Sequence, residues 1–290
     1  MKRLFESLIV FAVVAFTTSW AVAQSPYDKV VVFGDSLSDT GNAFEFTLGQ
    51  VPPAEAYFNG RFSNGPIWID FLQESLGGME VANFAVGGAS TGFGFRAPPD
   101  GIFVTGEDLM IPTVGTQIEL YLQQDAPSDD DLFIVWAGSN DLFTNRLPFF
   151  AALNMELHIR TLAAAGAEEF LVPNLAPLGE TPSVSGFESF LLNFFSLRFN
   201  RQLDRRLDSL EDELGITIHR LDTFTLTLIG TIFPDLFGFT NTDDAALFDI
   251  QAGLISPDEG ATYLFWDIIH PTSLTHSIIA AEAVRVLSTE

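Results

Sequence analysis

The 290-residue sequence contains no cysteine and only two lysines, Lys2 and Lys29. The absence of cysteine excludes disulfides, thiolate metal ligands and a cysteine nucleophile. Because basic residues are scarce, the formal net charge is −25. A surface of that charge is repelled by nucleic acid and by anionic lipid headgroups. We therefore expect no nucleic-acid partner.

The sequence also has little that resembles a metal site. His158, His219 and His276 stand apart from one another, and no HExxH pattern occurs. The aspartates in residues 125–131 lack the glycine and the terminal glutamate of a calcium loop, so they are better interpreted as a solvated surface. We expect neither a metal nor another cofactor.

An uninterrupted apolar run covers residues 8–16, after a basic start and before an A-x-A sequence that ends at Ala23. These three features are typical of a secretory signal peptide. A membrane anchor is the alternative, but the run is far shorter than the ~20 apolar residues needed to cross a bilayer. We expect residues 1–23 to be removed and residues 24–290 to form one secreted or periplasmic domain without a transmembrane segment.

Short apolar runs alternate with helical patterns along the remaining chain. The predicted strands cover residues 30–33, 81–86, 132–136, 169–172 and 216–219, and the predicted helices cover 66–76, 113–123, 148–165, 187–214 and 273–287. This alternation predicts an α/β fold with a parallel sheet covered on both faces.

Two stretches, residues 92–112 and 223–263, are assigned no regular structure. Both are longer than ordinary connections, so we expect functional loops or lids. The second is rich in phenylalanine and leucine. That composition indicates either a small hydrophobic cluster that holds the loop down or part of an acyl pocket.

Four short blocks carry groups suited to nucleophilic catalysis. They contain Asp35-Ser36, Gly87-Gly88, Asn140-Asp141 and Asp267-Ile268-Ile269-His270. Each block alone has a simpler interpretation as a helix cap, a tight turn or an extended loop. Three of them, however, follow successive predicted strands, and open α/β sheets bind ligands at the carboxyl ends of their strands. Their joint placement favours one shared site.

The chemistry of a serine nucleophile fits these blocks. The Ser36 hydroxyl needs an adjacent base, for which His270 is the candidate. Asp267 lies three residues before His270, where it can orient the imidazole and stabilise the imidazolium. The expected oxyanion donors are the N–H groups of Ser36 and Gly88 and the side-chain amide of Asn140.

The remaining polar residues of these blocks are assigned lesser roles. Asp35 and Asp39 are expected to support the site. Ser90 lies in a G-x-S-x-G pattern, which marks a nucleophile only when a helix follows directly. Residues 93–101 contain two glycines and two prolines and cannot begin a helix. We therefore reject Ser90 as the nucleophile.

In order and residue type, the blocks with Ser36, Gly88, Asn140 and Asp267-x-x-His270 resemble the SGNH (GDSL-type) hydrolase family. Residues 59–66 and 172–179 also resemble its secreted lipase and phospholipase branch. The resemblance implies a flavodoxin-like three-layer sandwich with a five-stranded parallel sheet, no metal, and an acyl intermediate on Ser36.

These features predict a secreted serine esterase or lipase that hydrolyses acyl esters of lipids or small alcohols. Two alternatives stay open. An alcohol that intercepts the acyl-serine would make the protein a phospholipase or lipid acyltransferase, provided that water is kept away. A catalytically silent carbohydrate- or lipid-binding module is the alternative of another class, and the complete set of catalytic residues argues against it.

Overall fold

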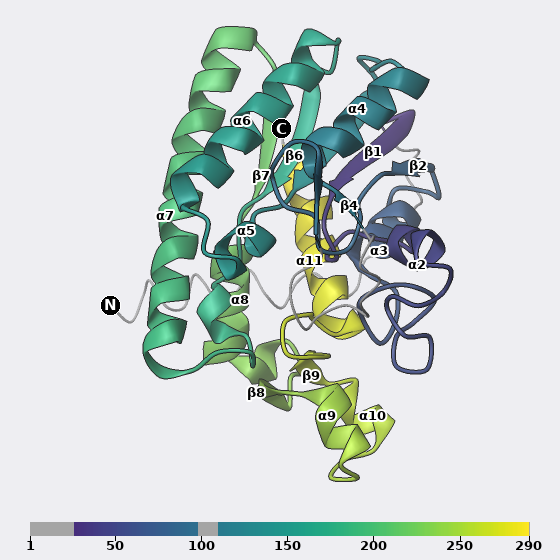
Figure 1. The fold of residues 1–290 in the computed structure, drawn as a ribbon, viewed down its shortest axis with the longest axis vertical. Coiled ribbons are helices and arrows are strands. Elements are labelled where there is room, and N and C mark those ends of the chain that lie inside the picture. Colours follow the sequence, from purple (N-terminus) through teal and green to yellow (C-terminus); the bar gives the residue numbers. More distant parts are fainter. Residues whose placement is uncertain (1–25, 98–109, 290) are drawn as a thin grey trace.

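The computed structural model describes residues 26–97 and 110–289. A five-stranded sheet lies at its centre (Figure 1). Its strands are β1 (Lys29–Gly34), β2 (Glu80–Asn83), β5 (Asp131–Trp136), β6 (Glu169–Pro173) and β7 (Thr217–Leu221). They lie in the order β2-β1-β5-β6-β7, and every neighbouring pair is parallel. The predicted five-stranded parallel sheet is confirmed. The expected signal peptide lies outside the described residues.

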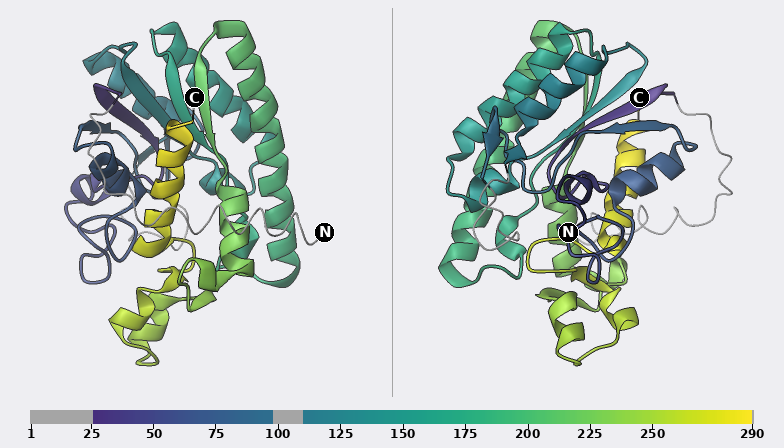
Figure 2. Two further views of the ribbon diagram at one scale, coloured as in Figure 1. Left: turned by 180° about the vertical axis from the view of Figure 1, so that it is seen from behind. Right: turned by 45° about the vertical axis from the view of Figure 1, so that its right-hand side comes forward.

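Helices cover both faces of this sheet, as Figures 1 and 2 show. One face packs against α4 (Val114–Gln124), α6 (Pro148–Ala164) and α7 (Gly186–Leu214), and the other against α3 (Trp68–Ser75) and α11 (Ser273–Leu287). Alternate residues of β1 point to opposite faces, as a strand requires. Val31 and Phe33 join the first core, and Val30 and Val32 join the second. The result is the predicted three-layer arrangement.

Shorter elements connect these layers. They are α2 (Asn42–Phe46), β3 (Phe95–Arg96), β4 (Ile111–Pro112), α5 (Ser139–Phe143), η2 (Leu178–Glu180), α8 (Thr223–Ile232), η3 (Pro234–Leu236), β8 (Asn241–Ala245), α9 (Ala246–Gln251), α10 (Pro257–Gly260) and β9 (Tyr263–Phe265). Within the described ranges, none of the helices combines the length and apolarity needed to cross a membrane.

The prediction that residues 223–263 lack regular structure was wrong. They contain α8 and a small lobe built from β8, α9, α10 and β9. The sequence of α8, TFTLTLIGTI, is apolar or β-branched almost throughout, so it has no polar face from which a helical period can be recognised. Phe239 forms a buried cluster with Leu264 and Phe265, whereas Phe233 is exposed.

The end of β1 is fixed from both sides. The N–H of Gly34 donates to Gln117 Oε1 at 2.9 Å, and Gln117 Nε2 donates back to the Gly34 carbonyl at 2.9 Å. A Cβ atom on Gly34 would lie 2.5 Å from the carbonyl oxygen of Trp136. Only glycine therefore allows β1 and β5 to approach this closely. The next two residues, Asp35 and Ser36, leave the sheet at a defined point.

Candidate active site

Ser36 and His270 are 234 residues apart in sequence, yet Ser36 Oγ lies 2.8 Å from His270 Nε2. The other ring nitrogen, Nδ1, lies 2.6 Å from Asp267 Oδ2. Oδ1 of Asp267 accepts the N–H groups of Ile269 and His270, each at 2.8 Å. This tight turn aims both side chains the same way. The structure thus brings the serine, histidine and aspartate expected from the sequence into one buried chain of hydrogen bonds.

Two aromatic residues contact the aspartate and the histidine of this chain of hydrogen bonds. The hydroxyl of Tyr57 donates to Asp267 Oδ2 at 2.7 Å, and the ring of Phe62 lies 5.1 Å from the His270 ring, centroid to centroid. Neither residue has a role expected from the sequence. Phe62 lies in the block 59–66, which carries family resemblance. Tyr57 lies outside that block and has no signal in the sequence.

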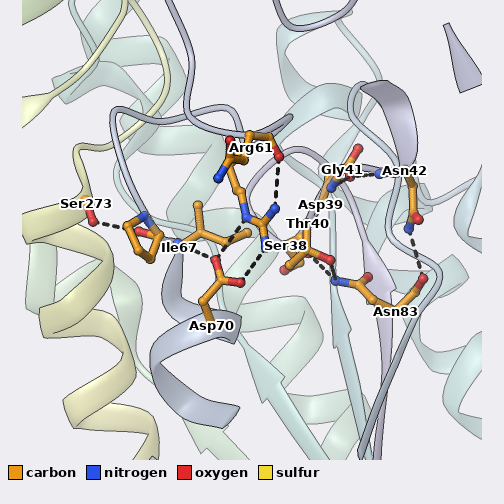
Figure 3. A network of polar contacts seen from close by, with 12 residues as sticks. Ser38, Asp39, Thr40, Gly41, Asn42, Arg61, Ile67, Asp70, Asn83 and Ser273 are labelled. Atoms are coloured by element: carbon orange, nitrogen blue, oxygen red, sulfur yellow. Dashed lines mark hydrogen bonds and ion pairs between the residues drawn. The ribbon is translucent and has the colours of Figure 1, made fainter. Parts of the chain in front are cut away.

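The same segment also fixes the start of α11. Ser63 Oγ donates to the Pro271 carbonyl at 2.8 Å, and the N–H of Ser273 donates to Asn64 Oδ1 at 2.7 Å. Ser273 Oγ in turn donates to the Pro66 carbonyl at 2.7 Å, a contact drawn in Figure 3. Residues 59–66 therefore act as a clamp on the loop that carries His270.

The two glycines after β2 are required for different reasons. A Cβ atom on Gly87 would lie 2.3 Å from the Phe62 ring, whereas Gly88 has a φ of 81°, a conformation that other residues adopt at a cost. Asp39 accepts the N–H of Gly87 at 2.7 Å. It also accepts the N–H groups of Gly41, Asn42 and Ala43, two of which Figure 3 shows. Asp39 thereby ties the glycine turn to the segment after Ser36.

The three expected oxyanion donors lie around this turn. Asn140 Nδ2 donates to the carbonyl of Ala89, the neighbour of Gly88, at 3.0 Å, and lies 3.4 Å from Asp35 Oδ2. Among residues 26–97 and 110–289, no acceptor is found for the N–H of Ser36 or Gly88. Two N–H groups without an acceptor and the nearby Asn140 amide are suited to receive a developing negative charge.

Burial acts on the pKa of each carboxyl group in the site. It raises the pKa of Asp35 to about 7 and that of Asp39 to about 6, even though Asp39 accepts four N–H groups. Burial also acts to raise the pKa of Asp267. There the charge and hydrogen bond of His270, with the hydroxyl of Tyr57, outweigh it and hold the pKa below its usual range. Asp267 is therefore ionised at neutral pH, so the Nδ1 proton of His270 faces it and Nε2 is free to accept a proton.

The other histidines and Ser90 lie outside this chain. Ser90 is buried and its Oγ has no partner in the described structure. His158 contacts the Thr91 carbonyl at 2.7 Å, and His219 pairs with Glu169. Burial lowers the pKa of His158 to about 4 and that of His276 to about 3. In the described ranges, no three histidine or acidic side chains gather closely enough to hold a metal ion.

Comparison with known proteins identifies the family of the chain. A family model described as GDSL-like Lipase/Acylhydrolase matches residues 30–283. The chain belongs to this family. As a GDSL-like lipase/acylhydrolase, it is an ester hydrolase whose family match spans every candidate residue from Ser36 to His270.

Named relatives extend over most of this GDSL-like chain. It is 25% identical to the phosphatidylcholine-sterol acyltransferase of Aeromonas hydrophila, over 100% of this chain and 98% of that one. It is 27% identical to the thermolabile hemolysin of Vibrio parahaemolyticus, over 91% and 65% of the two chains. A solved structure of a lipolytic G-D-S-L protein from Veillonella parvula shares the fold, with a TM-score of 0.52 and 14% identity over 90% and 99% of the chains.

The raised pKa of Asp35 predicts a pH-dependent loss of stability. Between about pH 4 and pH 7, the folded protein holds a proton on Asp35 that the unfolded chain has released, so this carboxyl lowers the free energy of unfolding as pH rises. Asp35→Asn removes that contribution. Urea unfolding from pH 4 to pH 8 should show the variant gaining stability relative to the native protein as pH rises. The exposed Asp129→Asn is the control, and a difference that does not change with pH would contradict the assignment.

Proposed function

We propose that the protein is a secreted serine esterase or lipase that hydrolyses acyl esters of lipids or small alcohols through an acyl-Ser36 intermediate. The observation that carries the proposal is the buried chain from Ser36 Oγ through His270 to Asp267, with distances of 2.8 and 2.6 Å. A nucleophile, a base within hydrogen-bond reach and a group that orients the base are the parts that acyl transfer to serine needs.

In the first half-reaction, Ser36 Oγ attacks the ester carbonyl while His270 Nε2 takes the hydroxyl proton. Asp267 stabilises the resulting imidazolium. The N–H groups of Ser36 and Gly88 and the Asn140 amide donate to the oxyanion, and each such donor typically contributes about 10²–10³ in rate. The tetrahedral intermediate then collapses. Its bond to the alcohol oxygen breaks, and the imidazolium donates its proton to that oxygen.

In the second half-reaction, water takes the place of the departed alcohol. His270 removes a proton from the water, whose oxygen attacks the acyl carbon, and the bond to Ser36 Oγ breaks. The proton returns to Ser36 Oγ, the acid product leaves and the starting state is restored. No step requires a metal or an organic cofactor.

Two adjoining cavities support an apolar acyl group. A cavity of about 70 Å³ next to Ser36 and His270 has mostly apolar walls, from η2, α8, β9 and α11. A second cavity of about 20 Å³ shares Thr227, Leu264, Thr275 and Ile279 with the first and continues between α8 and α11. We place the acyl chain in the first cavity, with its far end toward the second.

Acyl transfer to an alcohol is a second candidate activity. The observation that favours it is the full-length similarity to a protein named as a phosphatidylcholine-sterol acyltransferase. Both activities use the same acyl-serine and differ in whether water or an alcohol reaches it. Secretion is supported by the expected signal peptide in residues 1–23, with residues 24–290 as the mature domain. A catalytically silent binding module would not require an ionised Asp267 beside His270.

A covalent label tests the nucleophile. We expect an organophosphate to inactivate the enzyme and to modify Ser36, as detected by peptide mass spectrometry. Ser36→Ala should lose both labelling and hydrolysis of aryl acyl esters, because no other hydroxyl contacts His270 Nε2 among the described residues. The control is Ser90→Ala, which should keep both. Label on Ser90, or full turnover by Ser36→Ala, would overturn the assignment.

Chain-length preference tests the acyl cavity. Gly230 lines the second cavity, and a Cβ atom there would lie 3.2 Å from Phe239. A leucine side chain would fill this space. Each methylene kept out of apolar contact costs about 0.8 kcal/mol, so Gly230→Leu should lower kcat/KM about tenfold for long acyl chains and leave acetyl esters unaffected. Thr231→Leu, on the next residue of α8, is the control. An unchanged chain-length profile would place the acyl chain elsewhere.

A further inference from the structure

The first half of α7, residues 186–200, exposes apolar side chains on its outward face and buries both polar and apolar side chains on its inward face. Its inward face carries Ser189, Asn193 and Ser196, spaced at four and three residues. Ser189 Oγ donates to the Gly179 carbonyl, the N–H of Gly179 donates to Asn193 Oδ1 at 2.8 Å, and the N–H of Leu178 donates to Ser196 Oγ at 3.3 Å. Polar side chains therefore attach this half of the helix to η2.

The outward face of the same turns carries phenylalanine. Phe187, Phe190 and Phe194 are 74%, 64% and 45% exposed, and their spacing of three and four residues places them in one stripe along the helix. The rings of Phe187 and Phe190 stack at 6.2 Å. We call these three residues the phenylalanine stripe. Exposed apolar patches of this kind mark interaction surfaces.

The same half of the helix contains few charged residues. Residues 186–200 contain only Glu188 and Arg198 as charged residues, whereas residues 201–214 contain eight. Several charges of the second half form ion pairs, such as that between Arg206 and Glu156. The first half is thus the part of α7 that an apolar medium can receive at the smallest desolvation cost.

The phenylalanine stripe lies next to the candidate active site. The turns that expose it hold η2 on their opposite side, and Leu178 of η2 lines the cavity that contains Ser36 and His270. Figures 1 and 2 show this half of α7 extending past the sheet at the end where α8 lies. A surface bound to the stripe is therefore held beside the acyl cavity.

We propose that Phe187, Phe190 and Phe194 dock the enzyme on the surface of a zwitterionic or uncharged lipid aggregate. The proposal rests on the proposed function, because it supplies the surface from which a lipid ester enters the cavity. An apolar helical face with few charges inserts at the boundary of headgroups and acyl chains. The overall charge of −25 opposes binding to anionic headgroups.

Vesicle binding tests this proposal. We expect the native protein to co-sediment with phosphatidylcholine vesicles and not with phosphatidylglycerol vesicles. The triple variant Phe187→Ser, Phe190→Ser, Phe194→Ser should bind phosphatidylcholine vesicles at least tenfold more weakly and lose activity on a vesicle-borne ester by the same factor. Its turnover of a water-soluble acetyl ester and its Tm should match those of the native protein. Phe248→Ser is the matched control for Phe190→Ser, because Phe248 is also an exposed phenylalanine, 51% exposed, but lies on α9.

Three results would overturn the proposal. These are undiminished binding of phosphatidylcholine vesicles by the triple variant, a preference of the native protein for phosphatidylglycerol, and a native dimer that the triple variant converts to a monomer. The last result would assign the phenylalanine stripe to a second copy of the chain. Failure of the proposed function can be distinguished from failure of this proposal. If the proposed function is wrong, the native protein does not hydrolyse the soluble ester, whatever the result with vesicles.

Discussion

The hydrogen bond between Ser36 Oγ and His270 Nε2 is the contact on which the proposed chemistry depends. It joins a residue just after the first strand to one just before the last helix. Neither the turn after β1 nor the loop before α11 can fix its own position, because both lack a regular backbone ladder. The 2.8 Å separation therefore depends on the whole fold. The neighbouring contacts position the two segments that meet there.

Those contacts work from two directions. On the serine side, Gly34 is packed against β5 and bonded to Gln117 at both its N–H and its carbonyl. On the histidine side, the clamp of residues 59–66 and the hydroxyl of Tyr57 hold the loop. Because buried polar groups are costly when unpaired, a network in which each member has a partner favours one geometry over its alternatives.

Much of this arrangement could be predicted from the sequence. The five strands were recognisable as short apolar runs, and Ser36, Asn140 and Gly88 follow strands whose carboxyl ends share an edge. Tyr57 could not be predicted, since its contact with Asp267 spans 210 residues and leaves no local pattern. Helix α8 was missed because it lacks a polar face. The need for Gly87 depends on the ring of Phe62, which only the folded chain brings near.

The most direct test of the central claim is the kcat of Asp267→Asn on a soluble acyl ester at neutral pH. An asparagine amide beside His270 Nδ1 favours the tautomer that carries its proton on Nε2, so the ring no longer accepts a proton from Ser36. We expect a fall of about 10⁴-fold in kcat at neutral pH in a variant that remains folded. A variant that keeps its turnover within tenfold of the native protein would contradict it.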